Sequence, residues 1–278
     1  MKRFLSIVIL LLVAALPFAG MAEIDPAASE QLHAMQKMVR QADNITINGV
    51  FDIEYELGGT KVPYNASELS VIFQDPLIIH NTGVSATGET THLYVVQQGD
   101  ELVVYASHAN EGYMTDAEQI EAEDLEVEAM GELDAITHAM DDMVSAKTVG
   151  EETITVNGVE KACIRIAITV DVDDMLEEII HNTLLSTPNS DQIWTDTVEK
   201  SLHHLLVPME YWLSKDDGMV VQYTIDLSEV MSGVHAAIPD EADGGFTFTR
   251  YLATCQVYGI NDAEDIVIPA KYIAFNEH

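Results

Sequence analysis

The chain has 278 residues, with 12 Lys and Arg against 47 Asp and Glu, and a formal net charge of −35. This charge argues against nucleic-acid binding, which needs a basic surface, and against unassisted docking on an anionic membrane. Two cysteines do not form a disulfide framework. Their spacing alone does not decide whether Cys163 and Cys255 form a disulfide.

Residues 1–22 have the three parts of a secretory signal peptide. Lys2 and Arg3 precede an apolar run that ends near residue 18, and Ala22 closes a small-residue cleavage site. The run is shorter than the roughly 20 residues of a membrane-spanning helix, so a retained anchor is the less favoured alternative. Cleavage leaves 256 residues and no transmembrane segment. Because the leader carries two positive and no negative charges, the mature net charge becomes −37.

The first predicted element after the leader is a helix over residues 29–42. Leu32, Met35 and Val39 recur at helical spacing, which predicts one apolar stripe on this helix. Downstream the period changes to two, because Phe51, Ile53, Tyr55 and Leu57 alternate with Asp52, Glu54 and Glu56. That alternation predicts a strand with one buried and one solvated face.

Further strands are predicted at residues 68–74, 76–81, 91–98 and 102–107, with Gly99-Asp100 as a hairpin loop. Their short connections favour an antiparallel meander over parallel units. An acidic stretch follows, in which helical spacing of apolar residues predicts a helix that docks on the sheet. Its stripe consists of Leu133, Ile136, Met140 and Met143.

The second half begins with a predicted hairpin, residues 153–156 and 159–170, around Asn157-Gly158. Helical patterns cover residues 171–185 and 191–206. A second hairpin is predicted at 209–227, and the last strands at 246–258 and 266–268. With no domain boundary in sight, residues 23–278 are predicted to form a single domain. Its class is α+β: a curved antiparallel β-sheet, or half-barrel, with helices covering the concave face.

Several sequence segments, in this order along the chain, resemble those of a known family. They are INGVFDIE at 47–54, VGEETITVNGV at 149–159, DDML at 173–176, MEYWLSKDDGMVVQYTIDL at 209–227 and the closing Ile268-Pro269. The chain resembles the LolA/LppX-like superfamily of exported bacterial lipoprotein carriers. It looks most similar to a Gram-positive envelope lipoprotein branch of unknown function. The lipid-anchor cysteine usual in that branch is absent near residue 22.

The resemblance implies a half-open barrel whose helices enclose an apolar cavity for acyl chains, with no catalytic residues. The apolar strand faces supply the candidate lining, and methionine-containing helices supply a lid that can repack around different ligands. An ordinary dry core is the competing interpretation of the same residues. The candidate lining is Phe51, Ile53, Tyr55, Val71, Phe73, Ile166, Ile168, Tyr223, Ile225 and Phe248, and the candidate lid is Met175, Leu176, Ile179, Ile180, Trp194, Leu202 and Leu205.

Motifs for other chemistries are missing from the sequence. It contains no Gly-x-Ser-x-Gly, no His-Glu-x-x-His and no calcium-loop spacing, and adjacent His203 and His204 diverge on a helix. We therefore expect no enzyme, no cofactor and no metal. The sequence favours an extracytoplasmic carrier for a lipid or other apolar ligand, secreted to the bacterial envelope exterior or periplasm. The alternative is an envelope interaction or sensor module with a sealed core that binds a protein or peptide.

Overall fold

The computed structural model describes residues 24–99, 101–107, 136, 139–171, 206–237 and 246–270. The predicted signal peptide lies outside these residues, as do residues 172–205, which hold most of the two predicted lid helices. Within the described ranges, neither helix is long and apolar enough to cross a lipid bilayer.

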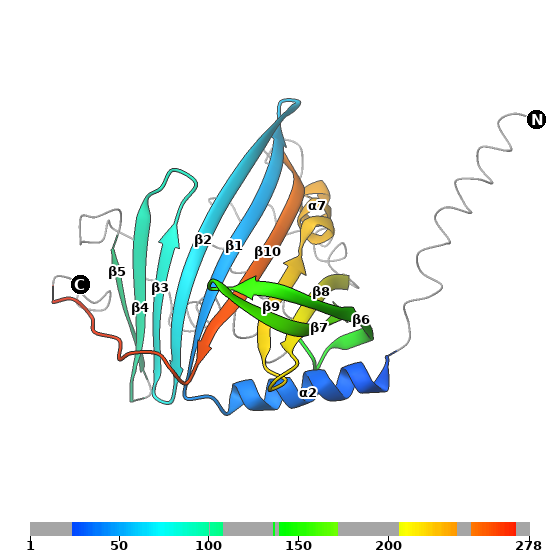
Figure 1. The fold of residues 1–278 in the computed structure, drawn as a ribbon. Coiled ribbons are helices and arrows are strands. Elements are labelled where there is room, and N and C mark those ends of the chain that lie inside the picture. The colour runs from blue at the N-terminus through cyan, green and yellow to red at the C-terminus, as the bar shows by residue number, and fades with distance from the viewer. Residues whose placement is uncertain are drawn as a thin grey trace, which may run out of the picture.

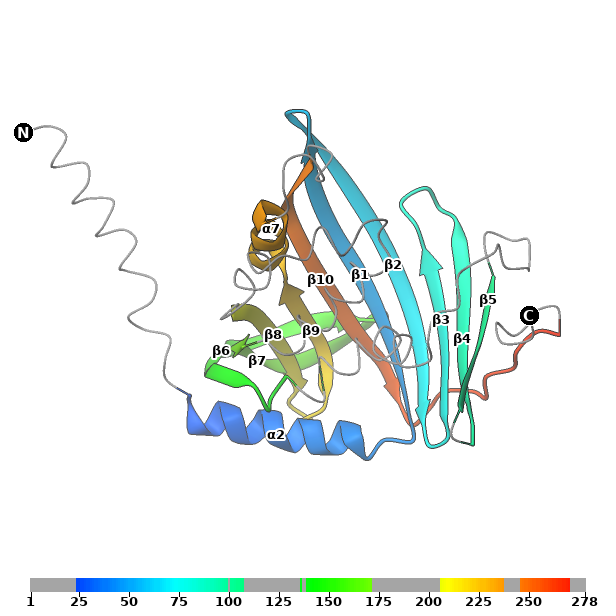
Figure 2. The same ribbon diagram turned by 180° about the vertical axis from the view of Figure 1, so that it is seen from behind.

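Ten antiparallel strands form one curved sheet (Figures 1 and 2). Their spatial order is β5-β4-β3-β2-β1-β10-β9-β8-β7-β6, so β5 and β6 are the edges and the barrel stays open. This confirms the predicted half-barrel. The strands are β1 (Asn44–Leu57), β2 (Thr60–Gln74), β3 (Leu77–Val84), β4 (Thr90–Gln98), β5 (Glu101–Ser107), β6 (Met143–Val156), β7 (Val159–Asp171), β8 (Leu206–Ser214), β9 (Val220–Asp226) and β10 (Phe246–Ile260).

Helix α2 (Pro26–Arg40) runs across one end of the sheet (Figure 1). It begins where the side chain of Asp25 accepts a hydrogen bond from the amide of Ala27, with a proline in the first turn, as a helix start favours. The predicted stripe of Leu32, Met35 and Val39 is fully buried. We call the sheet end beside α2 proximal and the opposite end distal.

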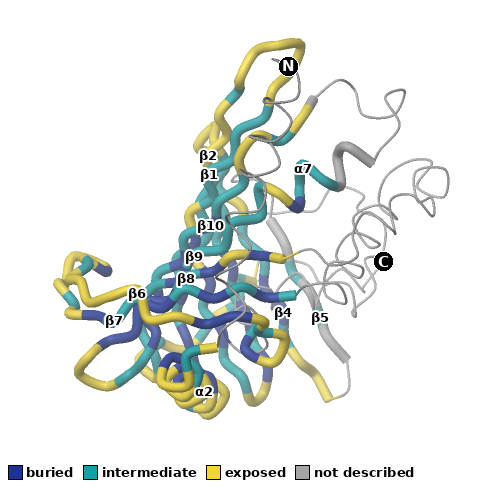
Figure 3. The backbone as a smooth tube through the Cα atoms, turned by 90° about the vertical axis from the view of Figure 1, so that its right-hand side faces the viewer, coloured by how far each residue is buried: buried dark blue, intermediate teal, exposed yellow. Residues whose placement is uncertain are grey.

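The main core lies at the proximal end, on the sheet face that α2 covers, which we call the inner face. Partners in an antiparallel ladder share a face, so Ile45, Ile72 and Ile79 line up across three strands beneath α2. Ile166 and Tyr223, from the other half of the sheet, belong to the same buried cluster. Because both halves turn this face toward one core, it is the concave face. Figure 3 shows buried residues gathered near α2 and exposed ones at the tip of β1 and β2, with further exposed stretches on α2 and beside β6 and β7.

Helix α7 (Ser228–Ala237) packs beside β10 on the inner side and was not predicted (Figure 2). It has ten residues and includes Gly233, so neither its length nor its helix propensity stands out from sequence. The side chain of Asp226 accepts a hydrogen bond from the amide of Ser228 and helps to begin it.

Several predicted elements or element boundaries were wrong. Met143 begins β6, where it pairs with Val170, although Ile136 and Met140 of the same predicted stripe are buried in the core. Leu206 belongs to β8 rather than to a helix. Residues 266–268 form no strand, because β10 is already paired on both sides, by β1 and β9.

Neither cysteine is part of a disulfide, and both are buried, in different clusters. Cys255 lies in the main core, and Cys163 in a smaller cluster with Trp212 on the outer face. The disulfide that the sequence left open is therefore not formed.

Candidate apolar ligand site

Six apolar and aromatic side chains lie together on the inner face, most of them distal to the main core, against which Ile225 still packs. The register sets Phe51 opposite Ala253, which in turn pairs with Ile225, while Ile53 faces Tyr251 and Tyr55 faces Phe248. Every member is neither fully buried nor fully exposed, in contrast to the core beside α2. We call this set the distal inner patch; it consists of Phe51, Ile53, Tyr55, Ile225, Phe248 and Tyr251.

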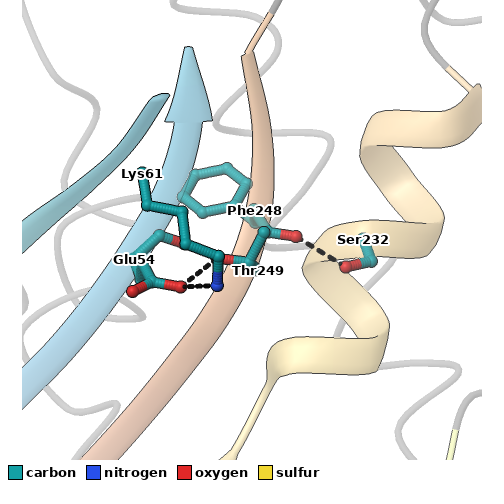
Figure 4. Close-up of polar contacts among 5 residues, drawn as sticks. All are labelled: Glu54, Lys61, Ser232, Phe248 and Thr249. Atoms are coloured by element: carbon teal, nitrogen blue, oxygen red, sulfur yellow. Dashed lines mark hydrogen bonds and ion pairs between the residues drawn. The ribbon is translucent and has the colours of Figure 1, made fainter. Parts of the chain in front are cut away.

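The outer face of the same strands is polar. Lys61 and Arg250 form ion pairs with Glu54 and Asp52, at 2.5 and 2.9 Å. Hydrogen bonds from Lys61 and from the hydroxyl of Thr249 hold the pKa of Glu54 below its usual value (Figure 4). Charged groups on one face and apolar groups on the other make this part of the sheet amphipathic, as the alternation predicted.

Helix α7 borders the patch through two serine hydroxyls. Ser232 donates a hydrogen bond to the carbonyl oxygen of Phe248 over 2.8 Å (Figure 4). The Ser228 hydroxyl accepts one from the amide of Tyr251 over 2.9 Å. Val230 of α7 is buried in the main core. Burial raises the pKa of the Tyr251 phenol above its ordinary value of 10. The helix thus fixes the two β10 aromatics of the patch.

The predicted lining divides into three groups. Phe51, Ile53, Tyr55, Ile225 and Phe248 come together in the distal inner patch. Ile166, Ile168 and Tyr223 share the inner face but are buried in the packed core. Val71 and Phe73 pair with Thr46 and Asn44, which places them on the outer face. The predicted lid residues Met175, Leu176, Ile179, Ile180, Trp194, Leu202 and Leu205 lie outside the described residues.

Tyr251 and Tyr64 were missed by the sequence prediction. A bulge at Thr249 shifts the alternation of β10, so that Phe248 and Tyr251 share a face although they are three residues apart. Tyr64 faces Ile53 and is 39% exposed. Its strand was predicted to begin only at residue 68, because Pro63 is unfavourable in a sheet.

Two buried polar atoms on the inner face lack a hydrogen-bond partner. They are the hydroxyl oxygen of Ser70 on β2 and the side-chain oxygen Oδ1 of Asn81 on β3. The two residues lie opposite each other in the strand register. Within the described residues, no group of three His, Cys, Asp or Glu side chains is arranged to hold a metal ion. His80 and His92 lie within 3.3 Å of each other on the outer face, where the register places His80 opposite Tyr94.

No protein-family model matches the sequence, and no curated protein matches it. Among solved structures, the chain is similar to the lipoprotein LppX of Mycobacterium tuberculosis, with 11% identity, 87% of this chain and 100% of that one covered, and a TM-score of 0.45. It is also similar to LprF of Mycobacterium bovis, with 10% identity, coverage of 89% and 99%, and a TM-score of 0.46.

A DUF1329 family protein of Desulfovibrio piger is more distant, with 12% identity, coverage of 86% and 93%, and a TM-score of 0.27. Likeness of this degree assigns no ligand.

Proposed function

We propose that this protein is a non-catalytic binding or carrier protein that holds a lipid or another apolar ligand on the distal inner patch. The observation that carries the proposal is the patch itself. Six large apolar side chains from β1, β9 and β10 lie side by side on the concave face and remain partly exposed. Partly exposed apolar side chains gathered on one face are typical of binding sites.

Hydrophobic burial alone is enough to hold such a ligand. Each CH₂ group that leaves water contributes about 0.8 kcal/mol, so a long acyl chain needs no charged partner in the patch. The polar outer face, with its Glu54–Lys61 and Asp52–Arg250 ion pairs, directs the ligand to the inner side. The aromatic rings of Tyr55, Phe248 and Tyr251 offer broad contact area to a flexible chain.

The remaining parts of the proposal rest on the sequence. Residues 1–22 direct export, and residues 23–278 act outside the cytoplasm as one domain. Methionine and leucine residues between 175 and 205 cover the bound ligand, because a lid of flexible side chains adapts to ligands of different shape. Catalysis is not part of this function, since the sequence shows no motif with a mechanism.

Two substitutions on one strand test the site. Ile53→Asn introduces an amide into the patch, whereas Val50→Asn makes a comparable change on the outer face, where Val50 is 44% exposed. Native mass spectrometry of protein purified from cells is compared before and after solvent extraction. We expect a lipid mass on the wild type and on Val50→Asn, and its loss from Ile53→Asn.

An equal lipid load on both variants would contradict the site. A wild type that carries no lipid and takes up none from a lipid panel would contradict the carrier function. That outcome would favour the alternative of an envelope module that recognises a protein or peptide.

A further inference from the structure

Ser70 and Asn81 lie at the border between the packed core and the distal part of the inner face. Their row runs Ile47, Ser70, Asn81 and Leu93 across β1 to β4. The next row toward α2 is entirely apolar, with Ile45, Ile72, Ile79 and Val95. The next distal row contains Gly49, Glu68, Gly83 and Thr91. The polar pair therefore begins where the apolar core ends.

Both side chains are deeply buried, with exposed fractions of 1% for Ser70 and 9% for Asn81. Among the described residues, neither the Ser70 hydroxyl nor the Asn81 Oδ1 oxygen has a hydrogen-bond partner. Buried polar atoms are nearly always paired, since leaving one unpaired costs its full desolvation penalty. Two adjacent exceptions on one face indicate a partner that binds there.

The chemistry of the two atoms defines that partner. Asn81 Oδ1 only accepts hydrogen bonds, whereas the Ser70 hydroxyl both donates and accepts. One ligand hydroxyl can form a hydrogen bond with each of these atoms. It can still do so if the Asn81 side-chain amide is turned by 180°, because a hydroxyl both donates and accepts. A net charge of −35 disfavours an anionic group.

The pair lies on β2 and β3, and β1 beside β2 carries Phe51, Ile53 and Tyr55 of the distal inner patch. Ile47, in the row of Ser70, is four residues from Phe51 and eight from Tyr55 on β1. At roughly 3.3 Å per residue, these steps span about 13 and 26 Å. A ligand with a polar end at Ser70 and Asn81 therefore extends its hydrocarbon part over the patch.

We propose that Ser70 and Asn81 bind the hydroxyl-bearing end of a neutral amphiphile whose hydrocarbon part lies on the distal inner patch. This inference rests on the proposed function and narrows its ligand class. Ionised fatty acids and phosphorylated lipids are disfavoured, and acylglycerols and other hydroxylated lipids are preferred.

The test compares two probes that have the same acyl chain, a monoacylglycerol and a fatty-acid methyl ester. Only the first carries hydroxyl groups. Binding to the purified protein is measured for the wild type, for the double variant Ser70→Ala/Asn81→Leu and for Ser67→Ala. Ser67 lies on the outer face of the same strand and serves as the matched control.

We expect the wild type and Ser67→Ala to prefer the monoacylglycerol. The double variant loses this preference, by about tenfold for two hydrogen bonds, and binds the ester unchanged. The same preference for the monoacylglycerol in all three proteins would overturn the assignment of Ser70 and Asn81. It would mean that a buried water forms hydrogen bonds with these two side chains instead. Failure of the wild type to bind either probe would overturn the carrier function as well.

A second measurement does not depend on the variants. In the wild type, the side-chain amide resonances of Asn81 shift when monoacylglycerol is added but not when the methyl ester is added. Identical spectra with both probes would overturn the proposal even if the double variant failed to fold.

Discussion

The hydroxyl of Ser232 on α7 donates a hydrogen bond to the carbonyl oxygen of Phe248 on β10 over 2.8 Å. This contact joins the helix to the strand that carries the aromatic end of the distal inner patch. We expect Ser232→Ala to lower the free energy of unfolding by about 1 kcal/mol, the net value of a typical internal hydrogen bond. Urea unfolding measures the change. An unchanged midpoint would show that the contact adds nothing to the docking of α7.

Substitution of Gly233, next to Ser232, is expected to raise the free energy of unfolding. A Cβ atom added at Gly233 meets nothing within 4 Å, so alanine fits there without displacing a neighbour. Since glycine is less favourable than alanine in a helix interior by about 0.8–1.0 kcal/mol, Gly233→Ala stabilises the protein by up to that amount. Both variants are measured by the same urea titration. A loss of stability in Gly233→Ala would mean that α7 needs a glycine for a reason other than space.

The side chain of Gln74 on β2 caps the carboxyl end of α2. Its side-chain amide donates hydrogen bonds to the carbonyl oxygens of Val39 and Ala42, over 2.9 and 2.8 Å. Gln74→Met keeps the length of the side chain but leaves both carbonyls without this donor, which costs about 1–3 kcal/mol. Thermal unfolding tests this, with Gln98→Met on an exposed position of β4 as the control. Equal melting temperatures for the two variants would contradict the capping role.

The sequence predicts local features of this fold better than long-range ones. Asn157 and Gly158 have φ values of 46° and 76°, the conformation that an Asn-Gly hairpin turn requires, so residue chemistry alone located this turn. The first ten residues of β6 were not predicted as strand. Beyond Ala146 they are mostly exposed at a sheet edge, and an edge needs no apolar alternation.

The candidate site shows the same limit. Alternation on β1 correctly grouped Phe51, Ile53 and Tyr55, because one strand fixes its own two faces. Val71 and Phe73 were assigned to the wrong side of the sheet, since a one-residue change of register moves a whole strand to the other face. Only the pairing of β2 with β1 reveals their place.

The last prediction concerns His80, whose ring stacks on Tyr94 at 4.1 Å and lies beside His92. Burial, and then the neighbouring imidazole, lower the pKa of His80 below its ordinary value of 6.5. As the pH decreases below 6.5, the unfolded chain therefore binds a proton at this position before the folded protein does. The free energy of unfolding decreases with it until the pH has passed the lowered pKa. His80→Phe keeps a stacking ring but cannot titrate, and it removes this part of the pH dependence. Urea unfolding of both proteins from pH 7.5 to 5.5 measures the difference, in which titration of the many carboxylates cancels. Parallel stability curves for wild type and variant would show that His80 has the same pKa in the folded and unfolded states.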